Sequence, residues 1–161
     1  MRAMSATTFT SAGSELEQLA AGVRSAIAMR GDWSHTARLV ADQLRAHLPT
    51  TDVLTPEQRG GSPDHAVGHT LHVEPDGSFS ITAVVWRPHQ FTRIHDHTTW
   101  CVFGVIQGVE HEDVYDADLN LIGSSTAYSA SSTASLRPAT STGSTTPAMR
   151  SPSRSTSTEP T

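Results

Sequence analysis

The stretch Ile94-His95-Asp96-His97 is the starting point for the fold of this chain. In an extended strand successive side chains alternate between two faces, so His95 and His97 would project together while Asp96 points away. Imidazole nitrogens bind divalent metals at about 2.1 Å, and two rings roughly 7 Å apart along a strand can reach one ion. The stretch therefore predicts a sheet protein that carries part of a metal site.

Alternating apolar and polar residues on both sides of this stretch predict more strands. Leu71 and Val73 share one face of a first strand, and Pro75-Asp76-Gly77 supplies a hairpin turn. The second strand of the hairpin is predicted from the alternation of Phe79, Ile81, Ala83 and Val85. Further strands are expected at residues 93–97, 100–107 and 109–115. Short strands at this spacing are typical of a small antiparallel barrel or sandwich.

The residues before the strands predict two helices. Apolar residues recur at helical spacing in residues 15–29, with Gly31 as a candidate cap. A second helix is expected from Asp32 or Ser34 to Leu48, with one apolar stripe formed by Trp33, Ala37, Val40, Leu44 and Leu48. Residues 51–65 are expected to be a loop, because they are rich in proline and glycine.

The composition changes after Gly123. About half of the following residues are serine or threonine, and large apolar side chains are almost absent after Leu136. Such a segment buries too little surface to offset its ordering entropy, so we expect a disordered tail over residues 128–161. The expected organisation is a flexible N-terminus at 1–14, a folded unit at 15–127 and this tail.

Charge and cysteine content exclude several classes of protein. The net charge of -5 and the scattered arginines argue against nucleic-acid binding. We expect no membrane partner, because the N-terminus lacks a secretory-signal pattern and no run approaches about 18 apolar residues. One cysteine, Cys101, cannot form an internal disulfide and suits a reducing compartment. A cytoplasmic monomer is therefore expected.

The flanks of the histidine pair resemble the first motif of the cupin superfamily. Cys101 stands four residues after His97 where the motif commonly has glutamate, Gly108 matches the closing glycine, and His89 occupies the earlier glycine position. The run from Trp86-Arg87-Pro88 through the pair to Trp100-Cys101-Val102 and Gln107-Gly108 is similar to the cysteine dioxygenase family of thiol dioxygenases. The resemblance covers about residues 70–115 and implies a mostly β, cupin-type antiparallel barrel behind an N-terminal two-helix cap.

The same resemblance implies an activity and a cofactor. Family members hold Fe(II) with three histidines, two of which match His95 and His97, and use O2 to oxidise a small thiol to its sulfinate. L-cysteine, 3-mercaptopropionate or a related thiol is the substrate class implied. Imidazole ligands suit Fe(II), and a metal-bound thiol loses its proton near neutral pH. A cupin that uses manganese or zinc for isomerase or other chemistry is the enzymatic alternative.

Further site residues can be assigned by position in the family pattern. Cys101 is a candidate for the thioether crosslink to a tyrosine found in animal members, or else a small buried thiol. The arginine that pairs with the substrate carboxylate in the cysteine-specific branch falls on His69 here. Arg87 and Arg93 could bind a carboxylate instead, or could be solvated loop residues. Trp86 and Trp100 are expected to pack in the core or at the rim of the barrel.

The second half of the family pattern is missing, and with it the third histidine. No histidine follows His111, and each remaining histidine is only a weak substitute: His35, His47, His65, His69, His72, His89 and His111. All eleven basic residues are arginine, as in GC-rich coding sequences, so a reading frame lost between Tyr128 and Leu136 would explain the tail. The expected product is an impaired enzyme, or a non-catalytic cupin remnant that binds metal or a small molecule.

Overall fold

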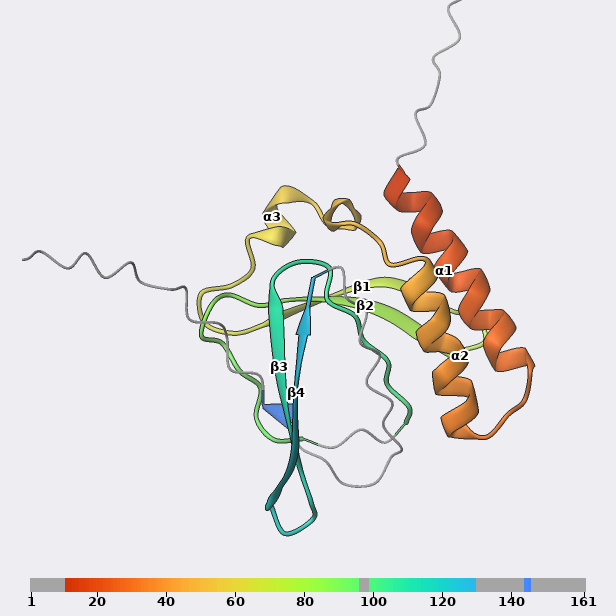
Figure 1. Cartoon of the computed structure of the whole chain (residues 1–161). Coiled ribbons are helices and arrows are strands. Elements are labelled where there is room, and N and C mark those ends of the chain that lie inside the picture. Colours follow the sequence, from red (N-terminus) through yellow and green to blue (C-terminus); the bar gives the residue numbers. More distant parts are fainter. Residues whose placement is uncertain (1–10, 96–98, 130–143, 146–161) are drawn as a thin grey trace, which may run out of the picture.

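A computed structural model describes residues 11–95, 99–129 and 144–145. Within these ranges a helical layer packs on one side of two small antiparallel sheets (Figure 1). One sheet pairs β1 (Val67–Val73) with β2 (Ser80–Val85). The other has the order β4-β3-β5, formed by Leu121–Tyr128, Val109–Tyr115 and Ser144–Thr145. The first hairpin runs across the direction of the second.

The two predicted helices are confirmed with shifted ends. Helix α1 covers Ser11–Ala28 and α2 covers Trp33–Ala46. The side chain of Asp32 accepts a hydrogen bond from the backbone N–H of His35 at 2.8 Å, which confirms Asp32 as the N-cap of α2. The chain leaves α1 through Arg30, whose φ is 51°, so the left-handed position falls there rather than at the predicted Gly31.

The main apolar core lies between the helices and the first hairpin. Buried side chains from both helices meet Phe79 of the hairpin: Leu19, Ala20, Val23, Ala26 and Val40. Ile81, Trp100 and Val102 pack against this cluster from the strand side, so the predicted packing role of Trp100 is confirmed. Trp33 is 46% exposed, so the predicted apolar stripe of α2 does not include its first residue.

The first hairpin contains a β-bulge that changes which residues face inward. Thr70 pairs with Thr82 and His72 pairs with Ile81, which leaves Leu71 as the extra residue. After the bulge the alternation is reversed, so His72 and Glu74 turn inward while Val73 is 60% exposed. The expectation that Val73 shares the inner face with Leu71 is therefore wrong.

The second hairpin contains the strand predicted at residues 109–115. Its seven paired positions run from Val109 opposite Tyr128 to Tyr115 opposite Leu121. The carboxylate of Asp116 accepts hydrogen bonds from the backbone N–H groups of Asp118 and Asn120 and closes the turn. Gly108 has a φ of 91°, and its carbonyl accepts from the Ser129 N–H at 2.9 Å at the open end.

The strands predicted at 93–97 and 100–107 are not formed in their described residues. Arg93, Ile94 and His95 lie in irregular backbone, and Cys101 makes only an isolated bridge. A strand is stable only when a neighbour satisfies its backbone groups, and these described residues do not join either sheet.

Within the described ranges the sheets do not close into a barrel. Helices also cover slightly more residues than strands there, so the described unit is α+β rather than mostly β.

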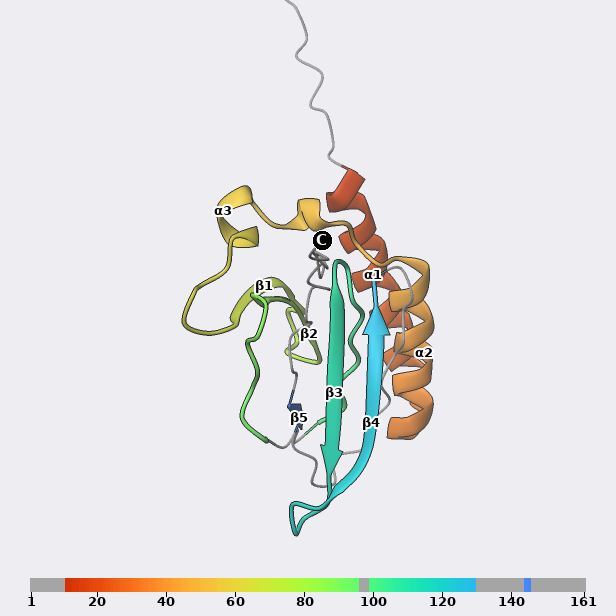
Figure 2. The ribbon, with the colours of Figure 1, turned by 60° about the vertical axis from the view of Figure 1, so that its left-hand side comes forward.

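Two further segments differ from the expected loop and tail. A 3-10 turn at Thr51–Val53 and the one-turn helix α3 at Pro56–Arg59 occupy the predicted loop, with a capping box formed by Thr55 and Gln58. In the expected tail, Tyr128 ends β4 and the two residues of β5 pair with β3. Figure 2 shows β3 and β4 side by side, with the helices to one side. No helix in the described ranges is long and apolar enough to cross a membrane.

Candidate functional site

His95 is the one member of the predicted pair that the structure describes. Its side chain is exposed, and its Nδ1 lies 2.8 Å from the carbonyl oxygen of Arg93. A carbonyl oxygen can only accept, so Nδ1 carries the proton of the neutral ring and Nε2 bears the lone pair. Histidines that bind metals commonly donate one ring N–H to a carbonyl or carboxylate in this way. The tautomer of His95 therefore fits a metal ligand.

The described residues do not complete a metal site around His95. His97 lies outside the described ranges, so its position relative to His95 is not described. Within those ranges no three side chains of histidine, cysteine, aspartate or glutamate lie close enough to share an ion. Cys101 is half-buried, after Trp100, which packs against the main core.

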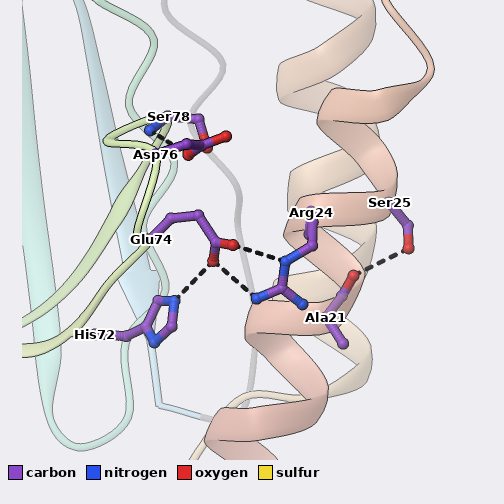
Figure 3. A network of polar contacts seen from close by, with 7 residues as sticks. All are labelled: Ala21, Arg24, Ser25, His72, Glu74, Asp76 and Ser78. Carbon is purple, nitrogen blue, oxygen red and sulfur yellow. Dashed lines mark hydrogen bonds and ion pairs between the residues drawn. The ribbon is translucent and has the colours of Figure 1, made fainter.

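A polar network joins helix α1 to the first hairpin (Figure 3). Arg24 donates from Nε and Nη2 to the two carboxylate oxygens of Glu74, each at 2.8 Å. His72 Nε2 lies 3.0 Å from Glu74 Oε2, and the His72 ring stacks at a tilt on Phe79 with centroids 5.4 Å apart. His72 and Glu74 reach the network because the bulge turns them inward. A bidentate pair of this kind fixes the angle and distance between two elements.

The environment of Glu74 stabilises its charged form. Its side chain is 10% exposed, whereas that of Arg24 is 54% exposed. The hydrogen bond from Arg24, with a second from His72, lowers the pKa of Glu74 to about 2. The carboxylate is therefore ionised at every pH at which the protein would be expected to work.

His69 faces the same inner side of the hairpin, two residues before the bulge. Its Nε2 is shielded from solvent and has no hydrogen-bond partner in the part of the chain that the structure describes. Buried polar atoms in folded proteins are usually paired, so such an atom indicates a missing partner. Three residues are predicted from the sequence as substrate contacts. Among them, only His69 points inward and has an unsatisfied polar atom in the described ranges.

The two arginine candidates are placed on the surface. Arg87 donates from Nε to the carbonyl oxygen of Gly60 at 2.9 Å, which ties the strand end to the loop after α3. Arg93 is exposed, and its carbonyl is the group that holds His95. The structure therefore gives Arg87 a loop-fixing contact and shows no carboxylate-binding arrangement around the described atoms of either arginine.

The remaining histidines lie at separate places in the fold. His35 and His47 lie at opposite ends of α2, and His65 is exposed in a loop. On β3, His111 Nε2 lies 3.1 Å from Asp113 Oδ1. In the described part of the chain, none of these imidazoles therefore belongs to a three-residue metal-binding group with His95.

Backbone conformation at His89 and Gly108 is unusual. His89 has a φ of 72° and Gly108 a φ of 91°, both in the left-handed region that favours glycine. These are the two positions at which the cupin motif has glycine. The structure thus has glycine-like backbone at both ends of the predicted motif.

Strand β3 carries two carboxylates on a partly buried face, which the sequence analysis missed. Glu112 is 6% exposed, and Glu110 lies two residues before it on the same face. Burial, with the charge of Glu112 as a smaller cause, raises the pKa of Glu110 to about 7. On β3 the acidic residues lie on either side of His111, so the sequence shows no apolar face there. The burial of these carboxylates could therefore not be predicted.

No family model matches the chain. The similarity to thiol dioxygenases therefore depends on the motif residues and on the local geometry described above.

Proposed function

We propose that this chain is a thiol dioxygenase of the cysteine dioxygenase type, impaired because the second half of the cupin pattern is missing. Fe(II) would be held by His95 and His97, and a small thiol would be oxidised to its sulfinate with both atoms of O2. In this proposal the chain derives from a protein with a cupin-type barrel.

The observation that carries this proposal is the backbone conformation at the two ends of the motif. A histidine at a φ of 72° costs free energy relative to glycine. His89 is the third residue of a turn in which the Gln90 N–H donates to the Arg87 carbonyl at 3.1 Å, and a glycine at this position of the cupin motif would suit the same turn. Gly108 has the corresponding conformation at the other end.

The arrangement of His95 supports the assignment of the metal ligand. The carbonyl of Arg93 orients the ring and leaves the lone pair on Nε2. When bound, the iron would supply a positive charge that favours the thiolate and would activate O2 beside it. Two imidazoles make an incomplete ligand set, so we expect loose iron binding and slow turnover.

The proposed substrate contact is His69. Its shielded Nε2 has no hydrogen-bond partner among the described residues, and a substrate carboxylate or amine is a group that could satisfy it. Arg87 and Arg93 are less suitable because of their surface contacts. A thiol that also carries a small polar group, such as L-cysteine or 3-mercaptopropionate, is therefore the proposed substrate class.

A second candidate is a non-catalytic cupin remnant that binds a metal or small molecule. Two observations favour it: the described sheets do not close, and the described residues gather no three ligands. The two candidates make the same prediction for iron binding and differ in product formation.

A thiol panel distinguishes them. The chain is loaded with Fe(II) under nitrogen, exposed to O2 with L-cysteine, 3-mercaptopropionate or cysteamine, and assayed for sulfinate by chromatography. The dioxygenase proposal predicts slow sulfinate formation that is lost in His95→Gln. If the chain binds iron but forms no more sulfinate than free Fe(II) does, the result would favour the non-catalytic remnant.

A further inference from the structure

The exposed face of the second hairpin holds a hydroxyl, an imidazole and a carboxylate in a row. Thr126 Oγ1 lies 3.0 Å from His111 Nδ1, and His111 Nε2 lies 3.1 Å from Asp113 Oδ1. His111 and Thr126 are direct cross-strand partners of β3 and β4. The row lies away from His95 in sequence and shares no residue with the proposed iron site.

The direction of each hydrogen bond follows from the carboxylate. Asp113 accepts from His111 Nε2–H, so the neutral ring has its lone pair on Nδ1. Nδ1 then accepts from the hydroxyl of Thr126. Ser124 also donates to Asp113 Oδ1, at 2.6 Å, which holds the carboxylate in place. The hydroxyl therefore faces a base whose tautomer is fixed from its other side.

This is the arrangement by which proteins activate hydroxyl nucleophiles. A base within hydrogen-bond reach takes the hydroxyl proton, and a third group orients the base. Thr126 is exposed, so a reagent can approach it from solvent. The side chain of His111 is 33% exposed and that of Asp113 is 19% exposed, which places the carboxylate farthest from solvent.

We propose that Thr126 is a reactive hydroxyl that accepts an acyl group from activated esters, with His111 as its general base and Asp113 as the positioning residue. In the reaction Thr126 Oγ1 forms a bond to the acyl carbon, and its proton passes to His111 Nδ1. The bond from that carbon to the leaving oxygen breaks, and the electron pair stays on the leaving phenolate. No oxidant or metal is required.

The test uses p-nitrophenyl acetate with the full chain and locates the acetyl group by peptide mass spectrometry. We expect acetylation of Thr126 in the wild-type chain. His111→Gln should slow it by roughly a hundredfold, the usual contribution of a general base. Asp113→Asn should also slow the acetylation of Thr126, although the imidazole of His111 is still present.

Two variants serve as controls. Thr126→Ser keeps the hydroxyl and should retain acetylation, whereas Thr126→Val should abolish it at this position. Ser125, also exposed, pairs with Glu112 and so faces the other side of the sheet, so Ser125→Ala should leave the rate unchanged. Far-UV circular dichroism checks that each variant folds. The proposal is overturned if Thr126 is not acetylated, or if His111→Gln acetylates it at the wild-type rate.

Discussion

At the scale of single residues, His89 has a backbone conformation that favours glycine. Its φ of 72° is costly for a residue with a Cβ atom. We predict that His89→Gly raises the free energy of unfolding by about 1 kcal/mol, because glycine relieves this cost. Urea denaturation measures it, and Gly108→Ala should shift stability in the opposite direction. An unchanged or lower stability for His89→Gly would contradict this account of the loop.

Glu74 makes the ion pair that joins the helical layer to the first hairpin, beside the apolar contact of Phe79. We predict that Arg24→Met lowers the thermal midpoint by several degrees, because Glu74 would stay shielded without its cation. Arg45, whose ion pair with Asp42 is exposed on both sides, is the matched control. Arg45→Met should change the midpoint little. Equal effects of the two substitutions would show that the Arg24 pair has no special role.

Glu110 gives stability a specific dependence on pH. Its folded pKa of about 7 exceeds the ordinary value of 4.5, so the folded state binds the proton more tightly. Stability should therefore fall as pH rises from about 4.5 to 7, by about 2 kcal/mol after allowing for partial exposure. Urea midpoints at pH 5 and pH 8 measure it, and Glu110→Gln should remove most of the difference. A wild-type slope that persists in the variant would assign the effect elsewhere.

Glu74 acts with the opposite sign and in a lower range. Its folded pKa of about 2 lies below the ordinary value, so its contribution is complete above about pH 4.5. That contribution is lost as pH falls from 4.5 toward 2. The two carboxylates together favour highest stability near pH 5.

At the scale of elements, the start of α2 is set by Asp32, the capping residue before its first turn. The Asp32 side chain satisfies an N–H group that the first turn leaves unpaired. We predict that Asp32→Ala destabilises the chain by about 1 kcal/mol in chemical denaturation. Asp42→Ala, at an exposed position within the same helix, should cost less than half of that. A larger cost for Asp42→Ala would mean that the cap does not define the helix start.

Elements set by local pattern could be predicted from the sequence, and those set by distant partners could not. Periodicity identifies both helices, and turn residues identify the first hairpin, whereas β4 was not predicted. The bulge at Leu71 could not be predicted, because it depends on the register between two strands. The pairing of Arg24 with Glu74 spans 50 positions and follows from that bulge. The strands predicted near His95 have the right composition, yet their described residues do not join either sheet.

The candidate site was predictable only in part for the same reason. The residue types and spacing of the histidine pair identify a possible metal ligand, and the His95 tautomer agrees with it. The direction of His69 and the burial of Glu110 depend on packing that no local pattern encodes. His97 lies outside the described residues, so the pairing of the two imidazoles stays a prediction.

At the scale of the whole molecule, the described part is a helical layer beside two sheets, and its main apolar core lies between the helices and the first hairpin. Phe79, Trp100 and the two helices build that core, and the polar network beside it joins the layers. His95, the described member of the proposed iron site, lies on irregular backbone outside both sheets. We therefore expect the core to stay folded when no metal is bound.

The central claim is that one ferrous ion binds through His95 and His97, and an anaerobic Fe(II) titration followed by calorimetry tests it most directly. The account predicts weak binding of one equivalent, reduced strongly by His95→Gln and by His97→Gln, with unchanged far-UV circular dichroism. Replacement of the exposed His65 is the matched control and should leave binding as it is. Iron binding of the same strength in both single variants and in the double variant would contradict the claim.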